Sequence, residues 1–113
     1  MKVGLTQMDI VFEDKEKNKE TVTKLIEDAV KKGVELLVFP EMTLTGFTMH
    51  TSTAGEEMMF SPTLRFFKEC SKEYSLAIAF GYVEDFGGKY YNKLMIVSEG
   101  RVLLDYDKIH PFN

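Results

Sequence analysis

The order of apolar and polar positions predicts a strand at the start of the chain, followed by a long helix. Residues 3–10 alternate between apolar and small or polar side chains, which is typical of a strand. From Asp14 to Lys32 the apolar residues recur at helical spacing. Their stripe consists of Val22, Leu25, Ile26, Ala29 and Val30. Asp14 is a suitable N-cap and Gly33 a suitable helix stop, so we expect a helix between them that packs on a sheet.

The next apolar run predicts a second strand, parallel to the first. Residues 35–39 carry the continuous apolar run of a strand buried on both faces. Pro40 ends this strand, because proline has no N–H to donate to a sheet. Strand, helix and strand then form a right-handed βαβ unit. Glu41 therefore follows the carboxyl end of a parallel strand, the edge at which open α/β sheets bind ligands.

A second helix is predicted after a long irregular segment. Residues 43–60 show no clear period, and we interpret them as a loop over the site. Ser61 is a favoured N-cap, and Pro62 is tolerated at the first helical position. Apolar positions at helical spacing then continue over residues 64–74.

The last third of the chain predicts one more parallel strand and two antiparallel strands. Residues 76–83 are apolar enough for a buried parallel strand. Gly87-Gly88 and Glu99-Gly100 are turn signals, and they bound strands over residues 90–97 and 102–106. The expected fold class is therefore α/β, with a mixed sheet and two packed helices.

Length, charge and composition exclude several classes of protein. The chain has 113 residues, the size of one small domain, and its 44% hydrophobic and 28% charged residues are typical of globular proteins. Its net charge of −4 and its lack of a basic block argue against a nucleic-acid partner. We expect no membrane span or signal peptide, and the single cysteine, Cys70, fits a reducing cytoplasm.

Taken one at a time, the candidate functional residues have ordinary explanations. Glu41 fits a solvated carboxylate and Lys108 a surface charge. His110 fits a hydrogen-bonded structural residue, and Cys70 a small buried hydrophobe in a helix. No group of residues has metal-ligand spacing, and no glycine-rich nucleotide motif is present. We expect chemistry without a metal or cofactor.

Two segments together are more specific. Residues 37–47 (LVFPEMTLTGF) and 105–112 (DYDKIHPF) closely resemble two signatures of the nitrilase superfamily, the carbon–nitrogen hydrolases. The opening residues 3–7 and the pair Tyr91-Asn92 are also similar to that family. The resemblance runs in order along the whole chain. It implies the amino-terminal half of an α-β-β-α sandwich, because family members are more than twice as long.

The resemblance also implies roles for individual residues. It makes Glu41 the catalytic glutamate and Lys108 the catalytic lysine of a Cys-Glu-Lys triad. The family's cysteine follows the lysine motif, whereas Cys70 precedes it and does not match. Because the sequence stops at Asn113, we expect residues 1–113 to be a partial domain, truncated before the nucleophile and inactive alone.

The chemistry of amide hydrolysis explains these residue types. A thiolate attacks the amide carbon, a carboxylate moves the protons, and a fixed cation stabilises the negatively charged oxygen. Residues 46–49 and 106–108 resemble the ω-amidase branch, which deamidates small 2-oxo acid amides. The resemblance implies a small amide substrate, with Phe47 contributing to the pocket wall.

Three interpretations remain open at the level of sequence. The chain is part of an amidase-type hydrolase, a non-catalytic scaffold or association module, or one half of a split enzyme completed by another chain. A half-sandwich leaves apolar surface and strand edges uncovered. We therefore expect a homodimer or a complementing carboxy-terminal half.

Overall fold

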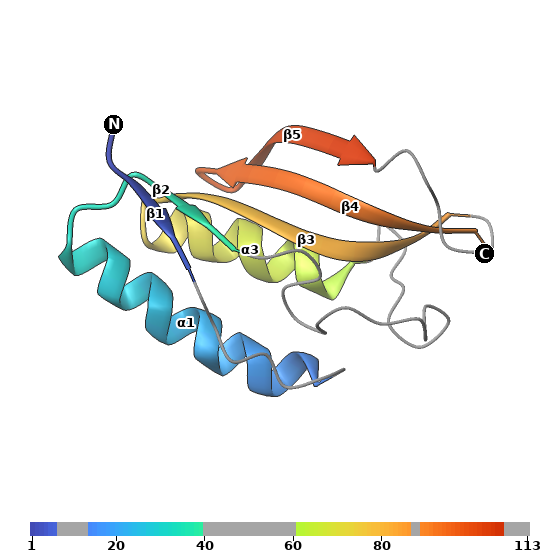
Figure 1. The fold of residues 1–113 in the computed structure, drawn as a ribbon, viewed down its shortest axis with the longest axis horizontal. Coiled ribbons are helices and arrows are strands. Elements are labelled where there is room, and N and C mark those ends of the chain that lie inside the picture. Colours follow the sequence, from blue (N-terminus) through green and yellow to red (C-terminus); the bar gives the residue numbers. More distant parts are fainter. Residues whose placement is uncertain (7–13, 40–60, 87–88, 108–113) are drawn as a thin grey trace.

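Helices and strands account for most of the described chain, which comprises residues 1–6, 14–39, 61–86 and 89–107 of a computed structural model (Figure 1). In chain order the elements are β1 (Val3–Leu5), α1 (Lys15–Lys31), β2 (Leu36–Val38), α3 (Pro62–Glu73), β3 (Ala77–Phe86), β4 (Lys89–Ser98) and β5 (Arg101–Asp107). In these residues, no helix combines the length and apolar character that crossing a membrane requires.

The five strands form one mixed sheet whose spatial order, β1-β2-β3-β4-β5, is the order of the chain. β1, β2 and β3 are parallel, and β4 is antiparallel to both β3 and β5. In Figure 1, β5 lies at the edge of the sheet away from α1. The structure thus confirms the predicted βαβ unit, hairpin and α/β class.

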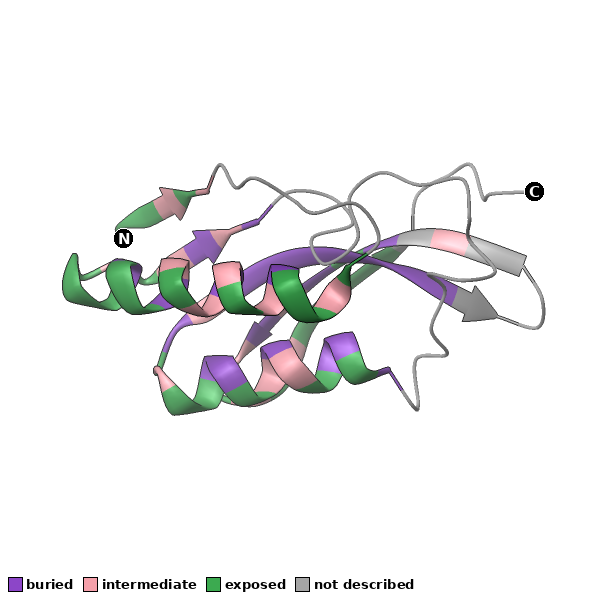
Figure 2. Ribbon diagram, turned by 90° about the horizontal axis from the view of Figure 1, so that it is seen from below, coloured by how far each residue is buried: buried purple, intermediate pink, exposed green. Residues whose placement is uncertain are grey.

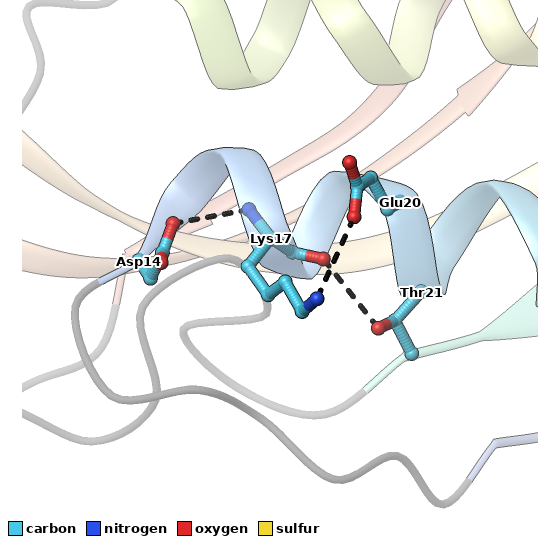
Figure 3. Close-up of polar contacts among 4 residues, drawn as sticks. All are labelled: Asp14, Lys17, Glu20 and Thr21. Carbon is cyan, nitrogen blue, oxygen red and sulfur yellow. Dashed lines mark hydrogen bonds and ion pairs between the residues drawn. The ribbon is translucent and has the colours of Figure 1, made fainter.

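The amino-terminal end of α1 is fixed by the predicted cap. The Asp14 carboxylate accepts a hydrogen bond from the backbone N–H of Lys17 at 3.0 Å (Figure 3). One turn on, Glu20 lies 3.9 Å from the Lys17 ammonium, and the Thr21 hydroxyl donates to the Lys17 carbonyl. At the other end Gly33 adopts a positive φ of 73°, which suits a residue without a side chain.

The second predicted helix, α3, also begins at its predicted cap. The Ser61 hydroxyl accepts from the backbone N–H of Leu64 at 3.0 Å, and Pro62 occupies the first turn. Phe67 and Ser71 are fully buried on the inner face of the helix, as the apolar spacing predicts.

One face of the sheet carries the core, because both helices pack on it (Figure 2). Phe67 of α3 stacks on Phe80 of β3, with ring centroids 4.1 Å apart and an interplanar angle of 16°. The buried core consists of Val22, Ile26, Ala29, Leu37, Phe39, Leu64, Phe67, Cys70, Leu76, Ile78, Phe80, Tyr82, Met95 and Val97. Its sheet residues alternate along each strand, so they share the face that the helices cover.

The strands of the hairpin are longer than the apolar pattern predicts. β3 extends to Phe86, beyond the expected end at residue 83, and β4 begins at Lys89. Cross-strand pairing continues through Glu84 and Asp85 to a final pair between Phe86 and Lys89. Hydrogen bonds to the partner strand continue through the polar residues, so both strands extend further. Local hydropathy does not reveal such pairing. Of the first predicted strand, Val3–Leu5 is observed, and residues 7–10 lie outside the described residues.

Candidate active-site edge and family

The strands that precede the predicted catalytic residues have their carboxyl ends on the same side of the sheet, which we call the candidate active-site edge. Glu41, Phe47 and Lys108 themselves lie outside the described residues. β2 precedes Glu41 and β5 precedes Lys108. Both strands run parallel to β3, since β4 is antiparallel to each of its neighbours. The carboxyl ends of β2 and β5 consequently point to the same side.

The register shows how far apart these two strands are. Val38 pairs with Ala79, Ala79 with Ile96, and Ile96 with Leu104, so these residues form one row across the sheet. Three spacings between neighbouring strands separate the ends of the row, a distance of about 14 Å. In sequence, Glu41 comes three residues after Val38 and Lys108 four residues after Leu104.

A charged cluster lies toward this edge, on the three strands β3, β4 and β5, and its members on β3 and β4 are buried. We define the charged cluster as Glu84, Lys93 and Asp105. The Lys93 ammonium lies 3.5 Å from a Glu84 carboxylate oxygen and 2.5 Å from one of Asp105. Glu84 and Lys93 are only 5% and 6% exposed. Because Lys93 is the register partner of Tyr82, it lies on the helix-covered face of the sheet.

The charged cluster is the feature of this edge that sequence reasoning missed. Lysine and glutamate are almost never buried unless they are paired, so their burial here depends on one another. The signal was present in the alternation of the hairpin strands. Glu84 continues the inward series of Ile78, Phe80 and Tyr82, and Lys93 continues the series of Val97 and Met95, where apolar residues are expected.

The environment of Cys70 does not favour a nucleophilic thiolate. It lies in α3, is 6% exposed and belongs to the hydrophobic core. Burial first, and the carboxylates of Glu73 and Glu69 second, raise the pKa of its thiol to about 11. The group is therefore a neutral thiol near pH 7, as expected of a small buried hydrophobe.

A hollow lies on the described surface away from this edge. It is an open hollow on α3 that is lined by Arg65, Lys68, Glu69 and Lys72 and reaches Gly100 in the turn between β4 and β5. This turn is at the end of β5 opposite Asp107. Within the described ranges, no group of three or more His, Cys, Asp or Glu side chains could hold a metal ion.

Comparison with known proteins identifies the family. The family model described as carbon-nitrogen hydrolase matches residues 2–113. A "hydrolase in agr operon" of Staphylococcus aureus is 28% identical, matching 97% of this chain and 43% of its own length. A nitrilase of Pyrococcus abyssi is also 28% identical, over 99% of this chain and 44% of its own. The chain thus spans less than half the length of these curated relatives.

A solved structure shows the same fold. The crystal structure of a CN-hydrolase superfamily protein from Xanthomonas campestris matches 96% of this chain and 40% of its own, with a TM-score of 0.84 and 22% identity. This agreement supports the mixed sheet with two helices as part of the nitrilase fold. With a family model that matches almost every residue, the chain belongs to the carbon–nitrogen hydrolase family.

Proposed function

We propose that this chain supplies the glutamate and the lysine of a Cys-Glu-Lys triad in an amidase-type hydrolase of small amides. The roles of Glu41 and Lys108 come from the resemblance of their motifs, within a family match that covers both. The observation that carries the proposal is the common edge at which β2 and β5, the strands before these residues, end. Ligands bind at this edge in open α/β sheets.

In the proposed reaction, Glu41 moves every proton. Its carboxylate takes the proton of the cysteine thiol as sulfur bonds to the amide carbon, and the carboxylic acid then protonates the departing nitrogen. The C–N bond breaks, ammonia leaves, and a thioester remains. Glu41 next takes a proton from water, whose oxygen attacks the thioester. The C–S bond breaks, the proton returns to the sulfur that leaves, and the carboxylic acid product is released.

Lys108 has an electrostatic role in both halves of the reaction. Each half passes through a tetrahedral intermediate with a negative charge on oxygen, which a fixed ammonium stabilises. Cys70 does not fit the nucleophile's role, since it is a buried neutral thiol on a helix. The proposal therefore takes the cysteine from outside these 113 residues and expects no turnover by the chain alone.

The proposed substrates are small amides, such as those of 2-oxo acids. The resemblance of residues 46–49 and 106–108 to the ω-amidase branch supports this class. Phe47 would contribute an apolar contact with the substrate. A cytoplasmic location completes the proposal, in keeping with a single buried thiol.

The test measures ammonia release from glutamine-like and 2-oxo acid amides. It uses the chain alone, and the chain combined with a complementing carboxyl-terminal segment that carries the family cysteine. We expect no turnover alone and turnover in the combination. Glu41→Gln should abolish ammonia release, and Lys108→Ala should lower kcat about 10²- to 10³-fold. Glu20→Gln, on the exposed side of α1, is the matched control. Full activity of Glu41→Gln would contradict the proposed role.

The face of the sheet opposite the helices has the character of a surface that associates with another chain. It carries exposed apolar side chains on both outer strands and on β4. They are Val3, Leu5, Leu94, Leu104 and Tyr106. We propose that a second copy of the chain or a complementing half covers this face. Association without amide hydrolysis in any combination would favour the scaffold interpretation instead.

A further inference from the structure

We propose that Lys93 is a positioning residue for Lys108. Its ammonium, bound between Glu84 and Asp105, fixes the register of β5 and thereby the point at which the chain leaves the sheet toward Lys108. This inference rests on the proposed function, which gives Lys108 its role. Lys93 itself is not proposed to touch the substrate.

The geometry connects three strands through one ammonium. Lys93 lies on β4, and its Nζ atom is 3.5 Å from Glu84 on β3 and 2.5 Å from Asp105 on β5. In the backbone register, Lys93 faces Asp107, the residue that directly precedes Lys108 in the sequence. The ion pair therefore acts within three residues of the proposed catalytic lysine.

β5 has few contacts that fix its register. Within the described residues, it is an edge strand that pairs with β4 alone. A bulge between Ile96 and Val97 interrupts its ladder, and Leu103 and Leu104 are exposed. Val102 is partly buried against the core, but it is the one apolar residue of β5 that the described structure places there, so apolar burial specifies the register weakly. A slip of one residue would turn every side chain of a strand to the opposite face.

The pair of Lys93 with Asp105 selects one register because a slip would separate it. Asp105 is the register partner of Met95, so it shares the helix-covered face with Lys93. After a slip of one residue, Asp105 would turn to the other face and leave Lys93 buried with less negative charge around it. Glu84 alone would then remain beside the buried ammonium. Fixing a register is the best-attested role of buried polar groups, which add little net stability.

The experiment measures the position of residue 108 directly. Nitroxide labels are attached to Lys108→Cys and to Lys24→Cys, an exposed site on α1, in a Cys70→Ala background. Pulsed electron paramagnetic resonance then gives the distribution of distances between the two labels. We expect one narrow distribution in the parent, a broadened or second distribution in Lys93→Met, and a narrow one again in Lys93→Arg.

Two further variants separate positioning from stability. Ser71→Ala is the matched control, because it removes hydrogen bonds of a buried side chain at the opposite end of β5, where the Ser71 hydroxyl accepts from the Gly100 N–H. It should lower the melting temperature and leave the distances unchanged. The triple variant Glu84→Gln/Lys93→Met/Asp105→Asn removes all three charges of the cluster together, so it should fold and still show the broadened distribution.

Distances in Lys93→Met or in the triple variant that match the parent would overturn the inference. In the complemented enzyme, we expect Lys93→Met to lower kcat about 10²-fold with KM retained, as for a displaced catalytic group. An unchanged kcat would also overturn it. If Glu41→Gln leaves hydrolysis intact, the proposed function fails. The distance measurement needs no enzyme activity, so it tests the effect of Lys93 on residue 108 separately.

Discussion

At the scale of single residues, burial has opposite consequences for the chemistry of Cys70 and Lys93. Cys70 is surrounded by apolar side chains and carboxylates, which favour its neutral thiol. Lys93 is equally buried but lies between two carboxylates, which suit its charged ammonium. Low exposure therefore leaves the Cys70 thiol uncharged in the core, whereas the Lys93 side chain lies in ion pairs with two carboxylates.

Alkylation tests the environment of Cys70. A rise in its pKa from the usual 9.0 to about 11 lowers the thiolate fraction at pH 8 about 100-fold. We therefore expect iodoacetamide to modify the native protein at least that much more slowly than the protein in denaturant, with mass spectrometry as the readout. Cys70→Ser is the control for off-site labelling. Equal rates in the native and denatured protein would contradict the assignment.

At the scale of elements, helix ends were predictable from local sequence and strand ends were not. Asp14, Gly33 and Ser61 act on backbone groups within a few residues, so their signals can be recognised in sequence. The hairpin strands extend because a partner strand is present, which depends on residues far along the chain. For the same reason, the charged cluster, with members on three strands, could not be assembled from hydropathy alone.

The turn between β4 and β5 provides a test at this scale. Glu99 and Gly100 both have positive φ, 52° and 77°, the geometry of a type I′ hairpin turn. Gly100→Ala should destabilise the protein by about 1 kcal/mol, because a side chain is strained in this conformation. Glu99→Asn should be neutral or stabilising, since asparagine tolerates it.

Chemical denaturation of both turn variants and the parent gives the comparison. Opposite shifts of the unfolding midpoint from two neighbouring positions would rule out a general effect of mutating the loop. If Gly100→Ala is as stable as the parent, the turn does not constrain the backbone as described.

At the scale of the whole molecule, the helices cover only one face of the sheet. The two helices, the mixed sheet and the family were all predictable from periodicity and motifs. The other face is partly covered within the chain, since Ala79 and Val83 are buried there, but the outer strands expose apolar side chains on it. Exposed apolar residues that share one face of a sheet are typical of a surface that contacts another protein.

Charged substitutions on this face should weaken association. Leu104 on β5 is 45% exposed and Leu94 on β4 is 37% exposed, and they lie on neighbouring strands. We expect Leu94→Lys/Leu104→Lys to shift the protein toward the monomer, measured by size-exclusion chromatography with light scattering. Val30→Lys is the matched control, because Val30 is an apolar residue of α1 with 42% exposure. Equal effects of both variants would contradict a face-specific interface.

The agreement between chain order and strand order has a consequence for synthesis on the ribosome. Each strand after the first pairs with the one made before it, so no strand of the described sheet has to wait for a later partner before it can join. When β5 leaves the ribosome, every partner that the described sheet needs has therefore already been made. The last strand to emerge, β5, is the one that carries the chain into the lysine motif.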